Sequence, residues 1–99
     1  MTDDRKAIEA VIQRVGALSG VVFVRNGVDA TPAEAAQHLR DKYAYFRSDI
    51  TTADDFIRLA GTRSELTGRP YLVRLPNGVQ RPAADLLREQ LRDVRARGR

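Results

Sequence analysis

The sequence predicts an α+β fold, in which a small antiparallel sheet made of two Asn-Gly β-hairpins packs with four helices in the order α-β-β-α-α-β-β-α. Two observations predict this class. An Asn-Gly pair follows an apolar run twice, at Asn26-Gly27 and at Asn77-Gly78. Asn-Gly is the strongest short-range hairpin signal, because both residues tolerate the positive φ angles of a type I′ turn. Apolar residues also recur at helical spacing in the segments around both pairs.

The first half of the chain is expected to form a helix, a hairpin and a second helix. The first helix covers about 3–18 and has one apolar face, formed by Ile8, Val11, Ile12, Val15 and Leu18. The hairpin joins a strand over 21–25 to a short strand over 28–30. Thr31-Pro32-Ala33-Glu34 is a capping box with proline at the first helical position. It begins a helix over about 32–47, whose core stripe is Ala35, Ala36, Leu39, Tyr43 and Phe46.

The second half is expected to repeat the hairpin between two helices. A helix over about 53–60 is capped by Thr52 and turns Phe56, Ile57 and Ala60 inward. The longest loop, over 61–70, leads to a strand over 71–75, and after Pro76-Asn77-Gly78 a short strand follows at 79–80. Pro82 begins the last helix, over about 82–96, with a buried stripe of Ala84, Leu87, Leu91 and Val94.

The strand over 21–25 is apolar at both alternations. Val21 and Phe23 lie on one face, and Val22 and Val24 lie on the other. A strand of this kind is expected to be covered on both sides. Helices that wrap the sheet are one such cover, and a second subunit in a homo-oligomer is the other.

Length, composition and cysteine content set limits on the class of protein. A chain of 99 residues buries roughly two-thirds of the surface that it exposes when unfolded, which is enough for one core and one domain over 1–99. The hydrophobic share of 42% and the charged share of 30% are those of a soluble globular protein. No apolar run reaches the length of a membrane span. Without cysteine and with one histidine, neither a disulfide nor a metal site is expected, and no nucleotide fingerprint indicates a cofactor.

The net charge of +4 is concentrated near the C-terminus. Four arginines at helical spacing form what we name the arginine stripe: Arg88, Arg92, Arg95 and Arg99. Such a stripe can bind phosphates. A solvated helix face with pairs such as Asp85 with Arg88, Glu89 with Arg92 and Asp93 with Arg97 is the favoured interpretation. Nucleic acid is not the expected partner, because no aromatic residue after Tyr71 is present to stack on a base.

Four segments, in order along the chain, carry a resemblance to a known family. They are FVRNG at 23–27, EAAQHLRDK at 34–42, TADDFI at 52–57, and Ser64 with TGRPYLV at 67–73. Over about residues 8–95 the chain resembles the YfeK-like family of small bacterial domains of unknown function (domain-of-unknown-function number 5329). The resemblance implies a bacterial protein and no established activity.

The same resemblance bears on localisation. Members of the family usually begin with a signal peptide and are expected in the periplasm, whereas this chain starts at Met1 almost directly in its first helix. We therefore expect the mature portion of a periplasmic protein, with a cytoplasmic member as the alternative.

His38 and Ser64 are the candidates for chemistry. His38, the only histidine, lies beside the apolar stripe of its helix, and Asp41 lies one turn further on. A hydrolase using His38 as base and Ser64 as nucleophile is one hypothesis. No nucleophile-elbow motif surrounds Ser64, so a histidine that hydrogen-bonds a neighbouring loop is favoured over a catalytic one.

The 61–70 loop holds the parts of an anion or polar-ligand site. Its residues offer guanidinium groups, hydroxyls and a permissive backbone: Arg63, Ser64, Thr67, Gly68 and Arg69. Turn roles for Thr62, Ser64 and Gly68 are the favoured interpretation of these individual residues. With His38, Lys42 and Tyr45 of the preceding helix, this loop predicts a non-enzymatic binding or adaptor domain of the bacterial cell envelope, whose partner is an acidic or polar protein or envelope component. The alternatives are the small hydrolase and a cytoplasmic nucleic-acid-binding protein acting through the arginine stripe.

Overall fold

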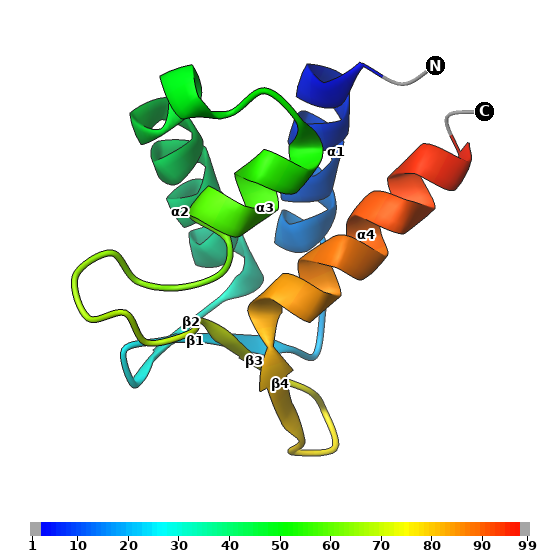
Figure 1. Cartoon of the computed structure of the whole chain (residues 1–99). Coiled ribbons are helices and arrows are strands. Elements are labelled where there is room, and N and C mark those ends of the chain that lie inside the picture. The colour runs from blue at the N-terminus through cyan, green and yellow to red at the C-terminus, as the bar shows by residue number, and fades with distance from the viewer. Residues whose placement is uncertain (1–2, 98–99) are drawn as a thin grey trace.

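The helices and strands follow one another in the predicted order (Figure 1). The structure is a computed structural model that describes residues 3–97. Its elements are α1 (Asp4–Gly16), β1 (Val22–Arg25), β2 (Val28–Ala30), α2 (Pro32–Tyr45), a 3₁₀ turn (Arg47–Asp49), α3 (Ala53–Ala60), β3 (Leu72–Arg74), β4 (Gln80–Pro82) and α4 (Ala83–Arg97). The α+β class and the order α-β-β-α-α-β-β-α are therefore confirmed.

The four strands form one antiparallel sheet in the order β2-β1-β3-β4. Each hairpin supplies two neighbouring strands, and β1 joins the hairpins by pairing Phe23 with Val73. The first turn is as predicted: Asn26 and Gly27 lie at φ +52° and +79°, between the paired residues Arg25 and Val28. These angles are those of a type I′ turn.

The second hairpin turn differs from the first. Gly78 has a φ of +86°, but among the described non-glycine residues only Asn26 has a positive φ, so Asn77 does not. The Gly78 amide donates to the Leu75 carbonyl at 2.9 Å, and the Leu75 amide donates to the Val79 carbonyl at 2.9 Å. Pro76 fixes a negative φ at the first position of the reversal, which favours a longer turn with one left-handed glycine.

Both predicted helix caps are present, and each is a capping box. The Thr31 hydroxyl accepts from the Glu34 amide at 3.1 Å, and the Glu34 carboxylate accepts from the Thr31 amide at 2.9 Å. Thr52 and Asp55 make the equivalent pair of hydrogen bonds at 3.1 and 3.2 Å. These bonds satisfy amides that a helix start otherwise leaves without a partner, so both helices begin where the sequence indicates.

Several element ends differ from expectation. The helix expected over 32–47 ends at Tyr45 and continues as the 3₁₀ turn, so Phe46 lies outside α2 and is only half-buried. The expected strand over 71–75 is reduced to Leu72–Arg74. Pro82 is not the first residue of α4. It is the last residue of β4, and in that strand it pairs with Leu72 of β3. Proline has no amide hydrogen to donate, and an edge strand such as β4 tolerates that loss.

All four helices lie on one side of the sheet, and the core lies between the helices and that side (Figure 1). The apolar stripes of the helices meet Phe23 of β1 and Val73 of β3 there, as the spacing predicted. The largest fully buried side chains are Phe56, Ile8, Ile57, Leu87, Val11, Val15 and Val73. None of the helices in the described part of the chain has the length and hydropathy that crossing a membrane requires.

Helices do not cover the second face of the sheet (Figure 1), so of the two covers considered for the strand, wrapping helices are not present on this face. Val22 and Val24 point away from Phe23 and remain half-buried. An ion pair lies across this face, with the Arg74 guanidinium of β3 at 2.8 Å from the Asp29 carboxylate of β2. These two residues flank β1 on either side, so the pair shields part of the apolar surface that the strand exposes.

Candidate functional site

The 61–70 loop is attached to the first hairpin through Asn26. The Asn26 side-chain amide donates to the Ser64 hydroxyl at 3.3 Å, and its carbonyl oxygen accepts from the Thr67 hydroxyl at 2.6 Å. Asn26 has the left-handed backbone that the type I′ turn requires, and this conformation places its side chain beside the loop. One asparagine therefore forms the turn and positions the loop.

Ser64 organises the loop from within. Its side chain is 6% exposed, and its hydroxyl accepts from the amides of Leu66 and Thr67 at 3.2 and 3.4 Å. Its carbonyl accepts from the Gly68 amide at 2.8 Å, where Gly68 has a φ of +73°. The turn roles that the sequence offered for Ser64 and Gly68 are those that the structure describes.

A row of polar side chains joins α2 to this loop. We name it the polar row, and its members are Arg25, His38, Tyr71, Lys42 and Glu65. The Arg25 guanidinium lies 2.8 Å from Nδ1 of His38, and Nε2 of His38 lies 3.2 Å from the Tyr71 hydroxyl. Lys42 Nζ lies 3.2 Å from the same hydroxyl and 3.2 Å from the Glu65 carboxylate. On α2, Lys42 thus contacts Glu65 in the loop, and His38, one turn earlier, contacts Tyr71 directly after it.

The hydrogen bonds of His38 define its protonation state. A guanidinium can only donate, so Nδ1 accepts from Arg25 and the ring proton is on Nε2, where it is donated to the Tyr71 hydroxyl. Burial lowers the pKa of His38 below its ordinary value of 6.5, and the positive charges of Arg25 and Lys42 lower it further, against the smaller opposing effect of Asp41. His38 is therefore neutral at pH 7.

This protonation state predicts that stability depends on pH through His38. The unfolded chain takes up a proton as the pH falls through 6.5, while the folded chain stays neutral until its lower pKa is reached. The contribution of neutral His38 to stability is thus fully present above pH 6.5 and is lost as the pH falls through the folded-state value. Urea denaturation between pH 7.5 and 5 should show this decrease. His38→Asn should flatten it, and an unchanged slope in that variant would contradict the assignment.

His38 and Ser64 are not hydrogen-bonded to each other within residues 3–97. Both ring nitrogens of His38 face Arg25 or Tyr71, and the Ser64 hydroxyl faces Asn26 and the loop amides. Asp41, the third residue of the hydrolase hypothesis, accepts from Gln37 at 3.0 Å. A base must reach the proton that it removes, so this geometry gives the hydrolase hypothesis no support.

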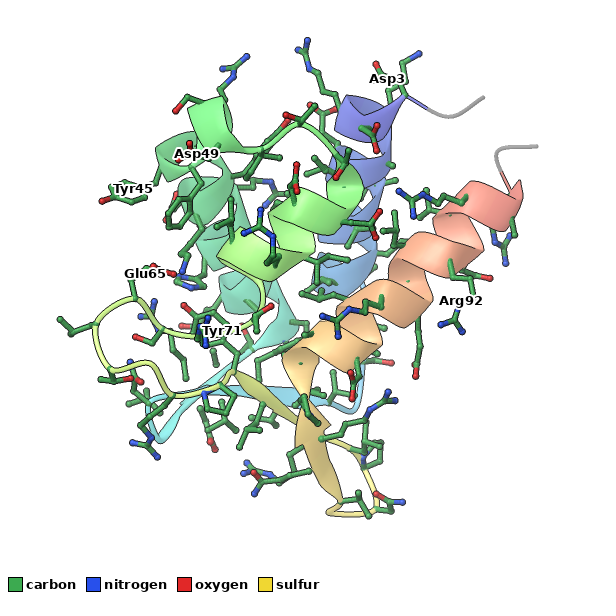
Figure 2. The ribbon with its side chains drawn as sticks, in the orientation of Figure 1. Asp3, Tyr45, Asp49, Glu65, Tyr71 and Arg92 are labelled. Atoms are coloured by element: carbon green, nitrogen blue, oxygen red, sulfur yellow. The ribbon has the colours of Figure 1, made fainter. Side chains whose placement is uncertain are left out.

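The exposed residues of the loop are available for contact with another molecule. Arg63 and Arg69 are exposed and take part in no ion pair within the described residues. Leu66 is 91% exposed. Tyr45, which is 80% exposed, projects outward from the end of α2 and away from Tyr71 (Figure 2), so it lies at the margin of this surface.

Two of the three described members of the arginine stripe, Arg88 and Arg95, are paired with carboxylates. Arg88 lies 3.3 Å from Asp85, and Arg95 lies 3.1 Å from Asp54 of α3. The expected pair of Asp93 with Arg97 is present at 3.6 Å. The expected pair of Glu89 with Arg92 is wrong, because Glu89 binds Arg81 of β4 at 2.5 Å instead. Arg99 lies outside the described residues. Pairing of this kind favours the solvated helix face over a phosphate-binding stripe.

Sequence reasoning missed two members of the polar row, Tyr71 and Glu65, and left the direction of Arg25 open. Each of Arg25 and Arg74 follows a valine in the first strand of its hairpin, yet Arg25 points toward α2 and Arg74 points to the opposite face. The signal for Tyr71 was available: an aromatic residue with a hydroxyl, placed directly between a polar loop and a buried strand, is suited to such a boundary.

Comparison with known proteins gives one family and one curated relative. The family described as "Family of unknown function (DUF5329)" matches residues 2–95. An uncharacterized protein YfeK of Salmonella typhimurium is 38% identical over 64 residues, which cover 65% of this chain and 53% of that protein. The aligned region thus spans about half the length of the relative. No solved structure matches the chain.

Proposed function

This chain belongs to the DUF5329 family, whose function is unknown, and from that premise we propose that it is a non-enzymatic binding or adaptor domain of the bacterial cell envelope. Its partner is an acidic or polar protein or envelope component. The contact surface is the 61–70 loop with the adjoining part of α2. We name this the loop surface, and its residues are His38, Lys42, Tyr45, Arg63, Ser64, Thr67, Gly68 and Arg69.

The observation that carries this proposal is a firmly positioned loop whose cations and largest apolar side chain are exposed. Asn26 and the internal hydrogen bonds of Ser64 fix the backbone. Arg63, Arg69 and Leu66 are nevertheless left in solvent. A loop that is already ordered loses little conformational entropy on binding, which favours affinity. Arginine suits carboxylate partners because its planar group donates two parallel hydrogen bonds.

The α2 residues of the loop surface have two roles. His38 and Lys42 hold the base of the loop through the Tyr71 hydroxyl, and Lys42 is only 11% exposed. They support the surface and contribute few atoms to a contact. Tyr45 extends it, because a tyrosine provides a large contact area at low conformational cost.

Site-directed photo-crosslinking in the native bacterium tests the proposal. A crosslinking amino acid in place of Leu66 is expected to capture a partner, whereas one in place of Arg92 on α4 is not. The double variant Arg63→Gln with Arg69→Gln should reduce the capture at least tenfold. The matched variant Arg88→Gln with Arg92→Gln also removes two positive charges, and it should leave the capture unchanged.

The opposite pattern would reject the loop surface. Capture through position 92 that survives the loop substitutions and is lost on the α4 substitutions would assign binding to the arginine stripe. Fractionation of the full-length protein tests the envelope location separately. Recovery in the cytoplasm would contradict that part of the proposal without affecting the loop surface.

A further inference from the structure

A second candidate site lies on the other side of the polar row, between the sheet and α2. It is a cavity of about 210 Å³ bounded by β1, β2, the start of β3, α2 and the start of α4. Its walls are mainly apolar, with Phe23 and Ala30 from the sheet and Ala35 and Leu39 from α2. Gly61 and Leu87, both buried, close the inner end.

The size of this cavity fits a small organic molecule. An apolar cavity of about 150 Å³ in a protein core is known to bind benzene. The present cavity is larger, and unlike a sealed core cavity it reaches the surface, where its outer lining residues Arg25, Val28 and Glu34 are exposed. It therefore accommodates an apolar body of about one aromatic ring or a short alkyl chain.

The charged groups at the outer end decide which ligand suits the cavity. Arg25 is in no ion pair within residues 3–97, and its recorded side-chain partner is neutral His38. The Glu34 carboxylate is engaged by the Thr31 amide in the capping box. The Asp29 carboxylate is held by Arg74 on the opposite face of the sheet. Arg25 is thus a cation without a carboxylate partner at the opening of an apolar cavity.

We propose that this cavity binds a small monocarboxylate with an apolar body. The body packs between Phe23 and Leu39, and the carboxylate accepts hydrogen bonds from the Arg25 guanidinium at the opening. His38 acts as a positioning residue, because its hydrogen bond from Arg25 directs the guanidinium across the opening. This inference goes beyond the loop surface, which involves a macromolecular partner and different arginines.

Titration of the ¹⁵N-labelled protein with 3-phenylpropanoate tests the proposal. Saturable amide shifts are expected at Ala30, Ala35 and Gly61. The uncharged 3-phenylpropanamide should bind at least tenfold more weakly, because it lacks the charge that Arg25 recognises. Arg25→Gln should weaken binding of the acid at least tenfold and leave that of the amide nearly unchanged.

Two further variants separate the cavity from its surroundings. Ala35→Leu fills the cavity and should abolish binding of both compounds. Arg69→Gln removes a loop arginine outside the cavity and should not alter either affinity, so this result does not depend on the loop surface. Equal affinity for acid and amide, unaltered binding of the acid by Arg25→Gln, or no shifts at the cavity would each overturn the proposal. If Ala35→Leu does not fold, the affinities of Arg25→Gln for the acid and for the amide still test the proposal.

Discussion

Replacing Tyr71 with alanine is expected to lower the free energy of unfolding by about 3 to 5 kcal/mol, the range for removing a large buried aromatic side chain. The ring is 8% exposed and lies edge-on to His38, with ring centroids 5.4 Å apart. It also lines the cavity, so its removal enlarges an existing void. The backbone amide of Tyr71 continues to bond Thr62, which confines the change to the side chain. Urea denaturation at pH 7.5 provides the measurement.

Tyr71→Phe is the matched control, because it removes only the hydroxyl. That oxygen accepts from the neutral imidazole of His38 and the ammonium of Lys42, each at 3.2 Å. Loss of an acceptor shared by two donors should cost about 1 to 2 kcal/mol. If Tyr71→Phe proved as stable as the original chain, the hydroxyl would not be the junction of the polar row. If both variants lowered the free energy of unfolding by the same amount, the buried ring would add nothing to stability beyond its hydroxyl.

The local features of the fold could be predicted because each depends on residues close together in the sequence. Thr31 and Glu34 satisfy each other's backbone groups within one turn, so their spacing alone indicates a helix start. Asn26-Gly27 specifies its own turn by tolerating positive φ. In the second hairpin the neighbouring Pro76 changed the turn type, and the hairpin itself still formed where it was expected.

The direction of the hairpin arginines could not be predicted, because it depends on strand pairing between distant segments. The dipeptide Val-Arg precedes both Asn-Gly pairs, as Val24-Arg25 and as Val73-Arg74. In the sheet, however, Val73 pairs with Phe23 and faces the core, while Val24 faces the opposite side. A shift of one residue in register exchanges the two faces of a strand. Arg25 therefore reaches His38 and Arg74 does not.

Part of the candidate site was predictable, because His38 and Lys42 lie close together in the sequence. The helical spacing of His38 and Lys42 placed them on one side of α2, and the length of the 61–70 loop marked it as a surface for binding. The cavity was not predictable, since its walls come from three strands, two helices, Gly61 and Tyr71. Ala35, Leu39 and Leu87 each have an ordinary core role by sequence pattern. Only their packing shows that together they leave space unfilled.

Gly27→Val is expected to destabilise the fold by about 1 to 3 kcal/mol, because it places a β-branched residue at a φ of +79°. A Cβ atom at this position would meet no atom within 4 Å, so the cost is one of backbone conformation and not of collision. Gly27→Asn is the matched control, since asparagine adopts left-handed φ values more readily, and it should cost clearly less. The measurement is thermal or urea unfolding of the three proteins. Equal stability of all three would contradict the type I′ turn in this hairpin.

Because Asn26 in the same turn holds Ser64 and Thr67, Gly27→Val should also speed amide hydrogen exchange in the 61–70 loop more than elsewhere on the surface.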